Sequence, residues 1–397
     1  MNDKNLVPGS VFGGMLLISG SCIGAGMLGL PILLGLCGFW PSLILIASSW
    51  LFMTFNGLLM VEINGWFYER VNIISMVGAS IGRIGKIISW ILYLFLFYSL
   101  LVAYVAGSGK IFSSYLPFSS QTSSIIFVLI ASIIIYAGTK PVDFVNRIFM
   151  AGLIVSYIGM IMLGIFKVSS SFFSYVDMKY FFLPLPVMVI SFGFHNMIPS
   201  LTAYMKGDLR RTKQSIIGGS LISLLIYFFW IIFVLGVVPV EGVNGLMNSY
   251  LEGNEATIAL KNILKSGSVL VFSNLFAIFA IITSMITQGL GLMHFIADGL
   301  KVKLNNKNNL WLLALAILPP TIFSIVYPKI FFAALGFAGA YFAVILFGIF
   351  PAMMAWIGRY LKNESSSYHV KGGKISLILA MAFSLIIILS QFINSLR

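Results

Sequence analysis

The sequence contains eleven apolar runs, and each is long enough, or nearly so, to cross a lipid bilayer. A membrane-spanning helix needs about 20 mostly apolar residues, and helices satisfy their own backbone hydrogen bonds inside lipid. The runs cover residues 9–36, 39–62, 84–108, 123–138, 145–166, 182–204, 215–237, 268–296, 310–325, 330–356 and 374–393. We therefore expect an all-α polytopic membrane protein that forms one transmembrane domain over residues 1–397.

The composition excludes an additional soluble domain. Hydrophobic residues make up 59% of the 397 positions and charged residues only 9%, whereas soluble domains carry about 25% charge. The net charge of +13 would suggest nucleic-acid binding in a soluble protein. Here, however, the lysines and arginines lie in the connections between the runs, seventeen on one side and seven on the other. Topology thus explains the basic character, and we expect no nucleic-acid partner.

The same asymmetry predicts how the chain lies in the membrane. The side with more Lys and Arg faces the cytoplasm by the positive-inside rule, so we expect a cytoplasmic N-terminus. An odd number of spans then leaves the C-terminus, at Arg397, outside. Two connections have an amphipathic pattern. Residues 68–81 predict a helix at the cytoplasmic interface, and residues 255–264 predict an external helix that either caps a vestibule or is a solvated loop helix.

Two of the runs are interrupted by helix-breaking residues. A break frees polar backbone groups, which lipid cannot satisfy, so breaks are tolerated where they line a cavity. The first run is broken within residues 18–31 by Gly20, Gly24, Gly26, Gly29 and Pro31, and the sixth within residues 190–200 by Gly193 and Pro199, beside His195 and Asn196. The alternative interpretation is that small residues allow close helix packing.

The two breaks occupy equivalent places in two halves of the chain. Runs one to five and six to ten form two sets of five, and an odd set size inserts the second half upside down. Ile18-Ser19 matches Ile190-Ser191 at an offset of 172 residues. Paired broken helices of this kind are typical of the central site of secondary transporters. We therefore expect inverted repeats over about 9–166 and 182–356, followed by an extra helix at about 374–393.

Several motifs resemble the hydroxy/aromatic amino acid permease family, within the amino acid/polyamine/organocation superfamily, and are most similar to its tyrosine-specific transport proteins. The motifs are Gly24-Ala-Gly-Met-Leu-Gly-Leu-Pro31, Tyr98-Ser-Leu-Leu-Val-Ala-Tyr104, Ser191-Phe-Gly-Phe-His195 with Pro199-Ser-Leu201, and Thr283-Ser284 followed by Ala297-Asp298. The resemblance covers nearly the whole chain. It implies a LeuT-type fold of ten core helices plus one, and secondary transport that is usually coupled to protons.

The resemblance places the unwound part of the first helix at residues 21–27 and the sixth-helix motif at residues 192–196. Relatives often have a small residue after the histidine, where this chain has Asn196, so side-chain selectivity is left open. The substrate-binding residues that we expect are Gly20, Ser21, Ile23, Gly24, Ala25, Gly26, Tyr104, Phe192, Gly193, Phe194, His195 and Asn196.

Each part of an amino acid has an expected partner in this set. Backbone amides at residues 24–26 would bind the carboxylate, because the N-terminus of a half-helix favours an anion, and the hydroxyl of Tyr104 would help to hold it. Carbonyl groups near Gly20 and Phe192 would face the ammonium group. Phe192 and Phe194 would contact the aromatic ring.

The coupling ion has two candidate sites. His195 lies inside an interrupted span, where burying a polar side chain costs free energy and usually indicates a function. Imidazole also changes charge near neutral pH. We therefore expect His195 to take part in proton coupling or substrate binding. Alternatively, carbonyl groups at residues 20–23 and the hydroxyls of Thr283, Ser284 and Thr287 would form a sodium site. Structural roles are expected for Glu62, at the end of its span, and for Asp143 and Asp298.

The sequence thus predicts a carrier in a bacterial-type inner membrane. It would import an aromatic amino acid, with tyrosine as the first expectation, by ion-coupled symport with alternating access; a tryptophan permease or a broader one is the alternative. A channel would need a repeated filter or a charged ring. An enzyme would need a nucleophile with its base, a metal cluster or paired acids, and the three histidines are dispersed. We expect no cofactor and no metal; the partners are the substrate, the coupling ion and lipid.

Overall fold

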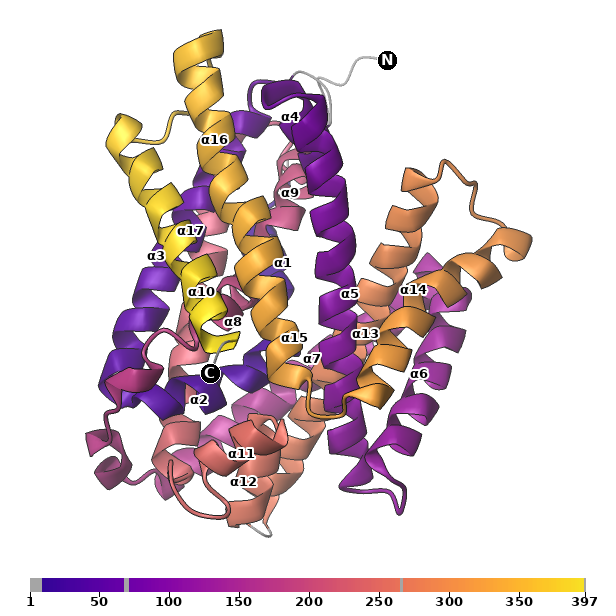
Figure 1. Cartoon of the computed structure of the whole chain (residues 1–397), viewed down its shortest axis with the longest axis vertical. Helices are drawn as coiled ribbons and strands as arrows, with labels where there is room; N and C mark the ends of the chain where they lie inside the picture. The colour runs from indigo at the N-terminus through magenta and orange to yellow at the C-terminus, as the bar shows by residue number, and fades with distance from the viewer. Residues whose placement is uncertain (1–8, 68–70, 265–266, 396–397) are drawn as a thin grey trace.

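The computed structural model describes residues 9–67, 71–264 and 267–395, and these residues are almost entirely helical (Figure 1). Among them, nine helical segments are long and apolar enough to cross a membrane, and a bent pair near the N-terminus makes a tenth. One further apolar helix, Ser120–Tyr136, has 17 residues. Every apolar run of the sequence is therefore a helix or a broken helix, which confirms a polytopic helical membrane protein.

The spans follow one another along the chain with short connections. They are α1 (Val11–Cys22) with α2 (Gly26–Cys37), α3 (Phe39–Asn64), α5 (Arg83–Ser113), α6 (Ser120–Tyr136), α7 (Thr139–Gly164), α8 (Leu185–Ser191) with α9 (Ile198–Tyr204), α10 (Leu209–Val237), α13 (Ser268–Gly299), α14 (Asn306–Val326), α15 (Phe331–Phe337) with α16 (Phe350–Ile357), and α17 (Gly373–Ser395). Helices α3, α16 and α17 form one side of Figure 1, and α6, α13 and α14 form the other.

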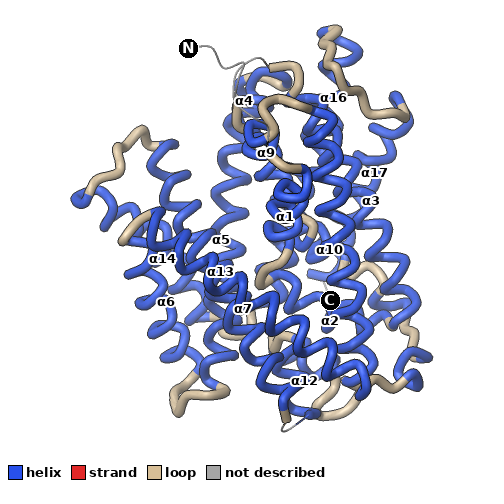
Figure 2. Tube along the Cα trace, turned by 180° about the vertical axis from the view of Figure 1, so that it is seen from behind, coloured by secondary structure: helices blue, strands red, loops and turns tan. Residues whose placement is uncertain are grey.

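Contacts between helices that are distant in the sequence hold these spans together. Helix α7 packs along α13, and α1 packs along α10. Helix α5 lies between the two sides of the molecule, where it contacts α6, α13, α14 and α15 (Figures 1 and 2). The broken spans therefore stand among continuous helices, which satisfy the rest of the backbone within themselves.

Two predicted connection helices are present. Helix α4 (Ile73–Ser80) begins after Asn72, whose side chain accepts a hydrogen bond from the Ser75 amide; residues 68–70 lie outside the described part of the chain. Helices α11 (Leu246–Glu252) and α12 (Ala256–Leu264) both pack against α2. The carboxylate of Glu255 accepts a hydrogen bond from the Thr257 amide at 2.7 Å, and this satisfies a free N–H at the start of α12. The α11–α12 pair covers the end of the molecule where α2 lies.

The tenth span is wound differently from the others. It contains three π-helical segments. Ala338–Ala343 and Ile345–Ile349 lie between α15 and α16, and Gly358–Lys362 follows α16. The first packs against α8 so closely that a Cβ atom at Gly339 would lie 1.8 Å from the Pro186 carbonyl oxygen. Only glycine fits such an approach. The sequence pattern did not predict these segments, which are often found at functional sites.

A buried ion pair joins the end of α3 to the tenth span. Glu62 is only 1% exposed. Its carboxylate accepts two hydrogen bonds from Arg359, at 2.8 and 2.6 Å, and one from the Val370 amide at 2.6 Å, and His369 Nδ1 lies 3.2 Å away. Glu62 thus lies near the end of its span, as expected. In contrast, Asp143 forms an exposed pair with Arg147 one helical turn later.

Candidate functional site

The first span is broken where the glycines predicted. Helix α1 ends at Cys22, α2 begins at Gly26, and the two are bent by 64°. The Ala25 amide donates to Ser284 Oγ on α13 at 2.9 Å. The amide N–H groups of Gly24 and Gly26 have no hydrogen-bond acceptor among the described residues. The break therefore leaves two unpaired N–H groups at the start of α2.

The sixth span is broken in the same region. Helix α8 ends at Ser191, a short 3₁₀ turn covers Phe194–Met197, and α9 continues from Ile198. Helix α2 contacts α8, and α1 contacts both the 3₁₀ turn and α9. The two breaks therefore lie side by side, although about 170 residues separate them in the sequence.

A tyrosine from α10 connects the two breaks. The Tyr227 hydroxyl is completely buried and lies 2.7 Å from the Cys22 carbonyl oxygen and 2.6 Å from the Ser191 carbonyl oxygen. These two residues are the last of α1 and of α8. A phenol has one proton to donate, so the two carbonyl groups share it. Tyr227 thus fixes both helix ends at a common point.

Trp230, one turn further along α10, supplies a hydrogen bond that the first turn of α2 lacks. In a regular helix the Met27 carbonyl would accept from the amide of residue 31, but Pro31 has no N–H. The Trp230 indole N–H donates to the Met27 carbonyl instead, at 3.0 Å. This side chain is fully buried. The kinked helix is therefore completed by a residue some 200 positions away.

We expect Trp230→Phe to destabilise the protein by about 1–3 kcal/mol, because a buried carbonyl group loses its donor. The midpoint of thermal aggregation of the purified protein in detergent measures this change. Trp311 is a matched control: it is partly exposed, and its indole N–H donates to Asn308 at 3.3 Å. Trp311→Phe should leave the midpoint nearly unchanged. Equal midpoints for the two variants would contradict the role of Trp230.

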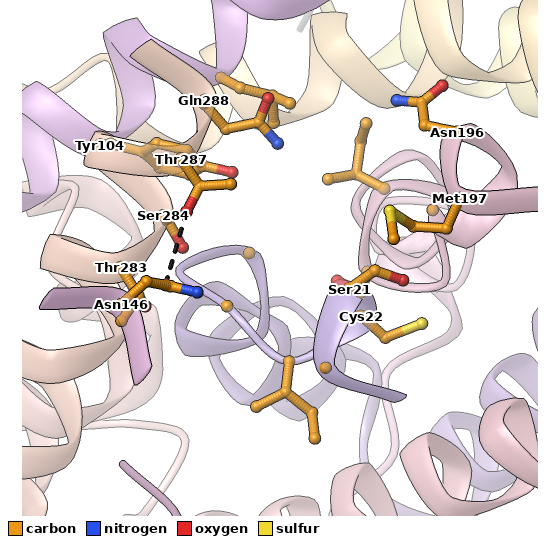
Figure 3. A pocket seen from close by; sticks show the side chains of 18 of the residues that line it. Ser21, Cys22, Tyr104, Asn146, Asn196, Met197, Thr283, Ser284, Thr287 and Gln288 are labelled. Atoms are coloured by element: carbon orange, nitrogen blue, oxygen red, sulfur yellow. Dashed lines mark hydrogen bonds between the residues drawn. The ribbon is translucent and has the colours of Figure 1, made fainter. Parts of the chain in front are cut away.

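A cavity of about 430 Å³ lies against both breaks (Figure 3). Helices α1, α5, α7 and α13, the sixth span and the π segment Ile345–Ile349 all contribute to its wall. Its polar side chains are Ser21, Tyr104, Asn146, Ser191, Asn196, Thr283, Ser284, Thr287 and Gln288. Among the described residues that line it, none is charged.

Most of the residues that the sequence predicted for the site line this cavity. They are Gly20, Ser21, Ile23, Gly24, Gly26, Tyr104, Gly193 and Asn196, together with the candidate ion ligands Thr283, Ser284 and Thr287. Ala25 is not among the lining residues, and its amide is occupied by Ser284.

Three residues of the sixth-span motif lie behind the wall of the cavity. Phe192 packs edge-on against Tyr227, with ring centroids 5.1 Å apart. The His195 ring is stacked between Phe194 and Phe347, at 4.8 and 5.0 Å. His195 is completely buried, and neither of its nitrogens makes a hydrogen bond of normal geometry with the residues described. In this conformation, Phe97 and Phe347 are the aromatic side chains of the wall, together with Tyr104.

Several lining residues that were not predicted have a recognisable spacing in the sequence. Leu96 and Leu100 precede Tyr104 at intervals of four, and Gln288 follows Ser284 at the same interval. Residues four apart share one face of a helix. Extending each predicted site residue along its own helix would therefore have found them. Asn146 and Met150 of α7 show the same spacing, but no predicted residue lies on that helix to start from.

The two halves of the first span differ in exposure beside the cavity. All twelve residues of α2 are buried. On α1, Leu16 and Leu17 line the cavity and are 51% and 41% exposed. The N-terminal half of the first span is therefore partly exposed, and the other half is buried.

Comparison with known proteins assigns the family. The sequence matches the tryptophan/tyrosine permease family over residues 8–391. It is 30% identical to tyrosine-specific transport system 1 of Haemophilus influenzae, over 94% of both chains. It is also 30% identical to the tryptophan-specific transport protein of the same species, over 96% of this chain and 95% of that one, and 29% identical to the low affinity tryptophan permease of Escherichia coli K12, over 99% and 98%. The resemblance seen in the sequence motifs is confirmed: this multi-pass membrane protein belongs to the tryptophan/tyrosine permease family.

Proposed function

We propose that the protein imports an aromatic amino acid, tyrosine in preference to others, across a bacterial inner membrane by proton-coupled symport with alternating access. The observation that carries the proposal is the pair of unpaired N–H groups of Gly24 and Gly26 beside an uncharged cavity. Unpaired amides at a helix N-terminus favour an anion such as a carboxylate. Relatives named for tyrosine and for tryptophan transport support the aromatic class.

An amino acid fits this arrangement because both of its charges meet backbone groups. The carboxylate would lie at the start of α2, near the hydroxyl of Ser284. The ammonium group would face the carbonyl groups that end α1 and α8, where Cys22 and Ser191 share one donor. The apolar side chains of Leu96, Leu100 and Phe347 would contact the ring. A zwitterion would thus need no buried ionic partner.

We also propose the LeuT-type fold with two inverted repeats of five spans. Helix contacts support this, because they are paired in the way a two-fold relation between the repeats requires. Helix α5 packs on α6, α14 and α15, while its counterpart α13 packs on α14, α6 and α7. Under the repeat, α6 corresponds to α14 and α7 to the span of α15. Each of these three contacts of α5 therefore corresponds to one contact of α13.

The cavity favours an inward-facing state of the transport cycle. The N-terminal half of the first span is the more exposed of the two halves, and the excess of basic residues in the connections on the side of the N-terminus favours a cytoplasmic location for it. The α11–α12 pair would then close the external side over α2.

Uptake of labelled tyrosine into proteoliposomes tests the proposed function. We expect saturable, stereospecific uptake that is driven by an imposed proton gradient. Unlabelled tyrosine should compete best, and tryptophan and phenylalanine less well. A separately imposed sodium gradient distinguishes the alternative coupling ion. Uptake that rises linearly with substrate concentration would contradict a carrier.

His195 remains our candidate for proton coupling. We expect His195→Phe, which keeps a ring between Phe194 and Phe347 but removes both nitrogens, to abolish the pH dependence of uptake without preventing membrane insertion. Initial rates between about pH 5.5 and 8, where imidazole titrates, measure this change. His294→Phe on α13 is the control and should keep the wild-type profile. A wild-type profile in His195→Phe would show that this residue only packs.

A further inference from the structure

We propose that Tyr93, which does not line the cavity, positions Asn196 so that the site selects a phenol ring over an indole ring. The inference rests on the proposed function, since it concerns the choice among aromatic amino acids. Tyr93 lies on α5 and is 5% exposed. Its hydroxyl donates to Asn196 Oδ1 at 2.7 Å, a length typical of an O–H donor, whereas an N–H donor gives about 2.9–3.0 Å.

The Tyr93 ring is held in place independently of this hydrogen bond. It packs against Phe295 and Phe347, with ring centroids 6.1 Å away in both cases. The Asn196 side chain is exposed to the cavity and has this one hydrogen bond among the described residues. A rigid, buried donor thus determines which end of a mobile amide is turned away from the cavity.

The consequence is that Asn196 offers the ligand a donor. With its oxygen bound to Tyr93, its amide nitrogen lies on the cavity side, and Figure 3 shows this orientation. The same view shows Asn196 and Gln288 facing each other across the cavity, with Ser21 and Cys22 of the first break below them. A substrate whose carboxylate and ammonium groups lie at the breaks would therefore extend its ring toward these two amides.

A phenol satisfies this pair, but an indole does not. The phenol oxygen can accept from Asn196 and donate to Gln288, whose amide has no partner among the described residues and is free to turn its oxygen inward. The indole N–H is a donor only, so it can bind Gln288 but leaves the amide of Asn196 unpaired. Phenylalanine leaves both amides unpaired. An unpaired polar group in a closed site costs about 1–3 kcal/mol, and 1.4 kcal/mol corresponds to tenfold in affinity.

The test is Tyr93→Phe, which keeps the packed ring and lets the Asn196 amide turn over. We expect the ratio of kcat/KM for tyrosine to that for tryptophan to fall about tenfold, through a lower KM for tryptophan, whose N–H could then donate to the Asn196 oxygen. 4-Aminophenylalanine matches tyrosine in size but is mainly a donor. It should compete poorly in the wild type and clearly better in Tyr93→Phe.

Tyr98→Phe is the matched control. Tyr98 lies on the same helix, and its hydroxyl donates to the Leu315 carbonyl at 2.8 Å without contacting the cavity. This variant should keep the wild-type ratio. An unchanged ratio in Tyr93→Phe, or an equal loss for all three substrates, would overturn the proposal, since a merely structural role affects every substrate alike.

A second variant keeps the proposal testable if Tyr93→Phe does not fold. Asn196→Leu removes the amide at similar size and should lower the affinity for tyrosine to about that for tryptophan, because either ring then has Gln288 alone as its polar partner. In the wild type, tyrosine must also bind more tightly than 4-aminophenylalanine. Failure of either result would overturn the inference while leaving aromatic transport intact. Absence of any aromatic uptake by the wild type would instead contradict the proposed function.

Discussion

Gly24→Val is expected to abolish binding and uptake of every amino acid tested, whatever its side chain. A Cβ atom at this position would lie 2.8 Å from Ser284 Oγ, inside the distance that real Cβ atoms accept. Ser284 would have to move, and its hydrogen bond from the Ala25 amide would be lost. The added methyl groups would also fill the space in front of the unpaired Gly24 amide. Equilibrium binding of labelled tyrosine to the purified protein measures the effect apart from transport.

The second glycine of the break provides the matched controls. A Cβ atom at Gly26 would meet Ile190 and Ser191 at an ordinary 3.6 Å, so Gly26→Ala should retain binding. Gly26→Val adds two methyl groups that these contacts leave no room for, and we expect it to abolish binding as well. If the valine variants kept full affinity and changed only the preferred ring, backbone recognition of the carboxylate would be wrong.

Glu62→Ala is expected to lower the free energy of unfolding by about 3–5 kcal/mol, because removal of one partner leaves a buried charge uncompensated. The side chains of Glu62 and Arg359 are 2% and 5% exposed. Arg359 Nη1 already lacks a partner among the described residues, so the loss of the carboxylate would leave the whole guanidinium group unpaired apart from the Val370 carbonyl. The fraction of monomeric protein that survives heating in detergent measures the change.

The exposed pair of Asp143 and Arg147 is the control for this variant. Their side chains are 54% and 78% exposed, and exposed pairs contribute about 0–1 kcal/mol. Asp143→Ala should therefore leave thermal survival almost unchanged. The double variant Glu62→Leu with Arg359→Met should recover much of the lost stability, since apolar residues of similar volume can replace a buried pair. If the stability of the double variant did not recover, the pair would have a role besides the mutual neutralisation of its two charges.

The positions of the spans and of both breaks could be predicted from the sequence because their causes are local. Runs of apolar residues determine where helices cross lipid, and glycine or proline marks where they stop. Glycines and prolines in the first and sixth spans located the two breaks for the same reason. These signals depend only on neighbours in the chain.

What could not be predicted depends on distant residues. Phe192 and Phe194 were expected to contact the ring, but the residues of this break do not follow the helical period, so the face that each side chain occupies is set by its packing against Tyr227 and Phe347. Likewise, no local pattern pairs Glu62 with a guanidinium group almost 300 residues later. The partners of the Met27 carbonyl and of Asn196 also come from other helices.

The single proton of Tyr227 makes the two breaks energetically dependent on each other. Two carbonyl groups compete for it, so a ligand that relieves one of them releases the proton to strengthen the other. Such linkage is reciprocal. If binding at the first break strengthens binding at the second, then binding at the second strengthens binding at the first by the same free energy. The two halves of the chain would then respond to one substrate as a single cooperative unit, through a side chain that belongs to neither break.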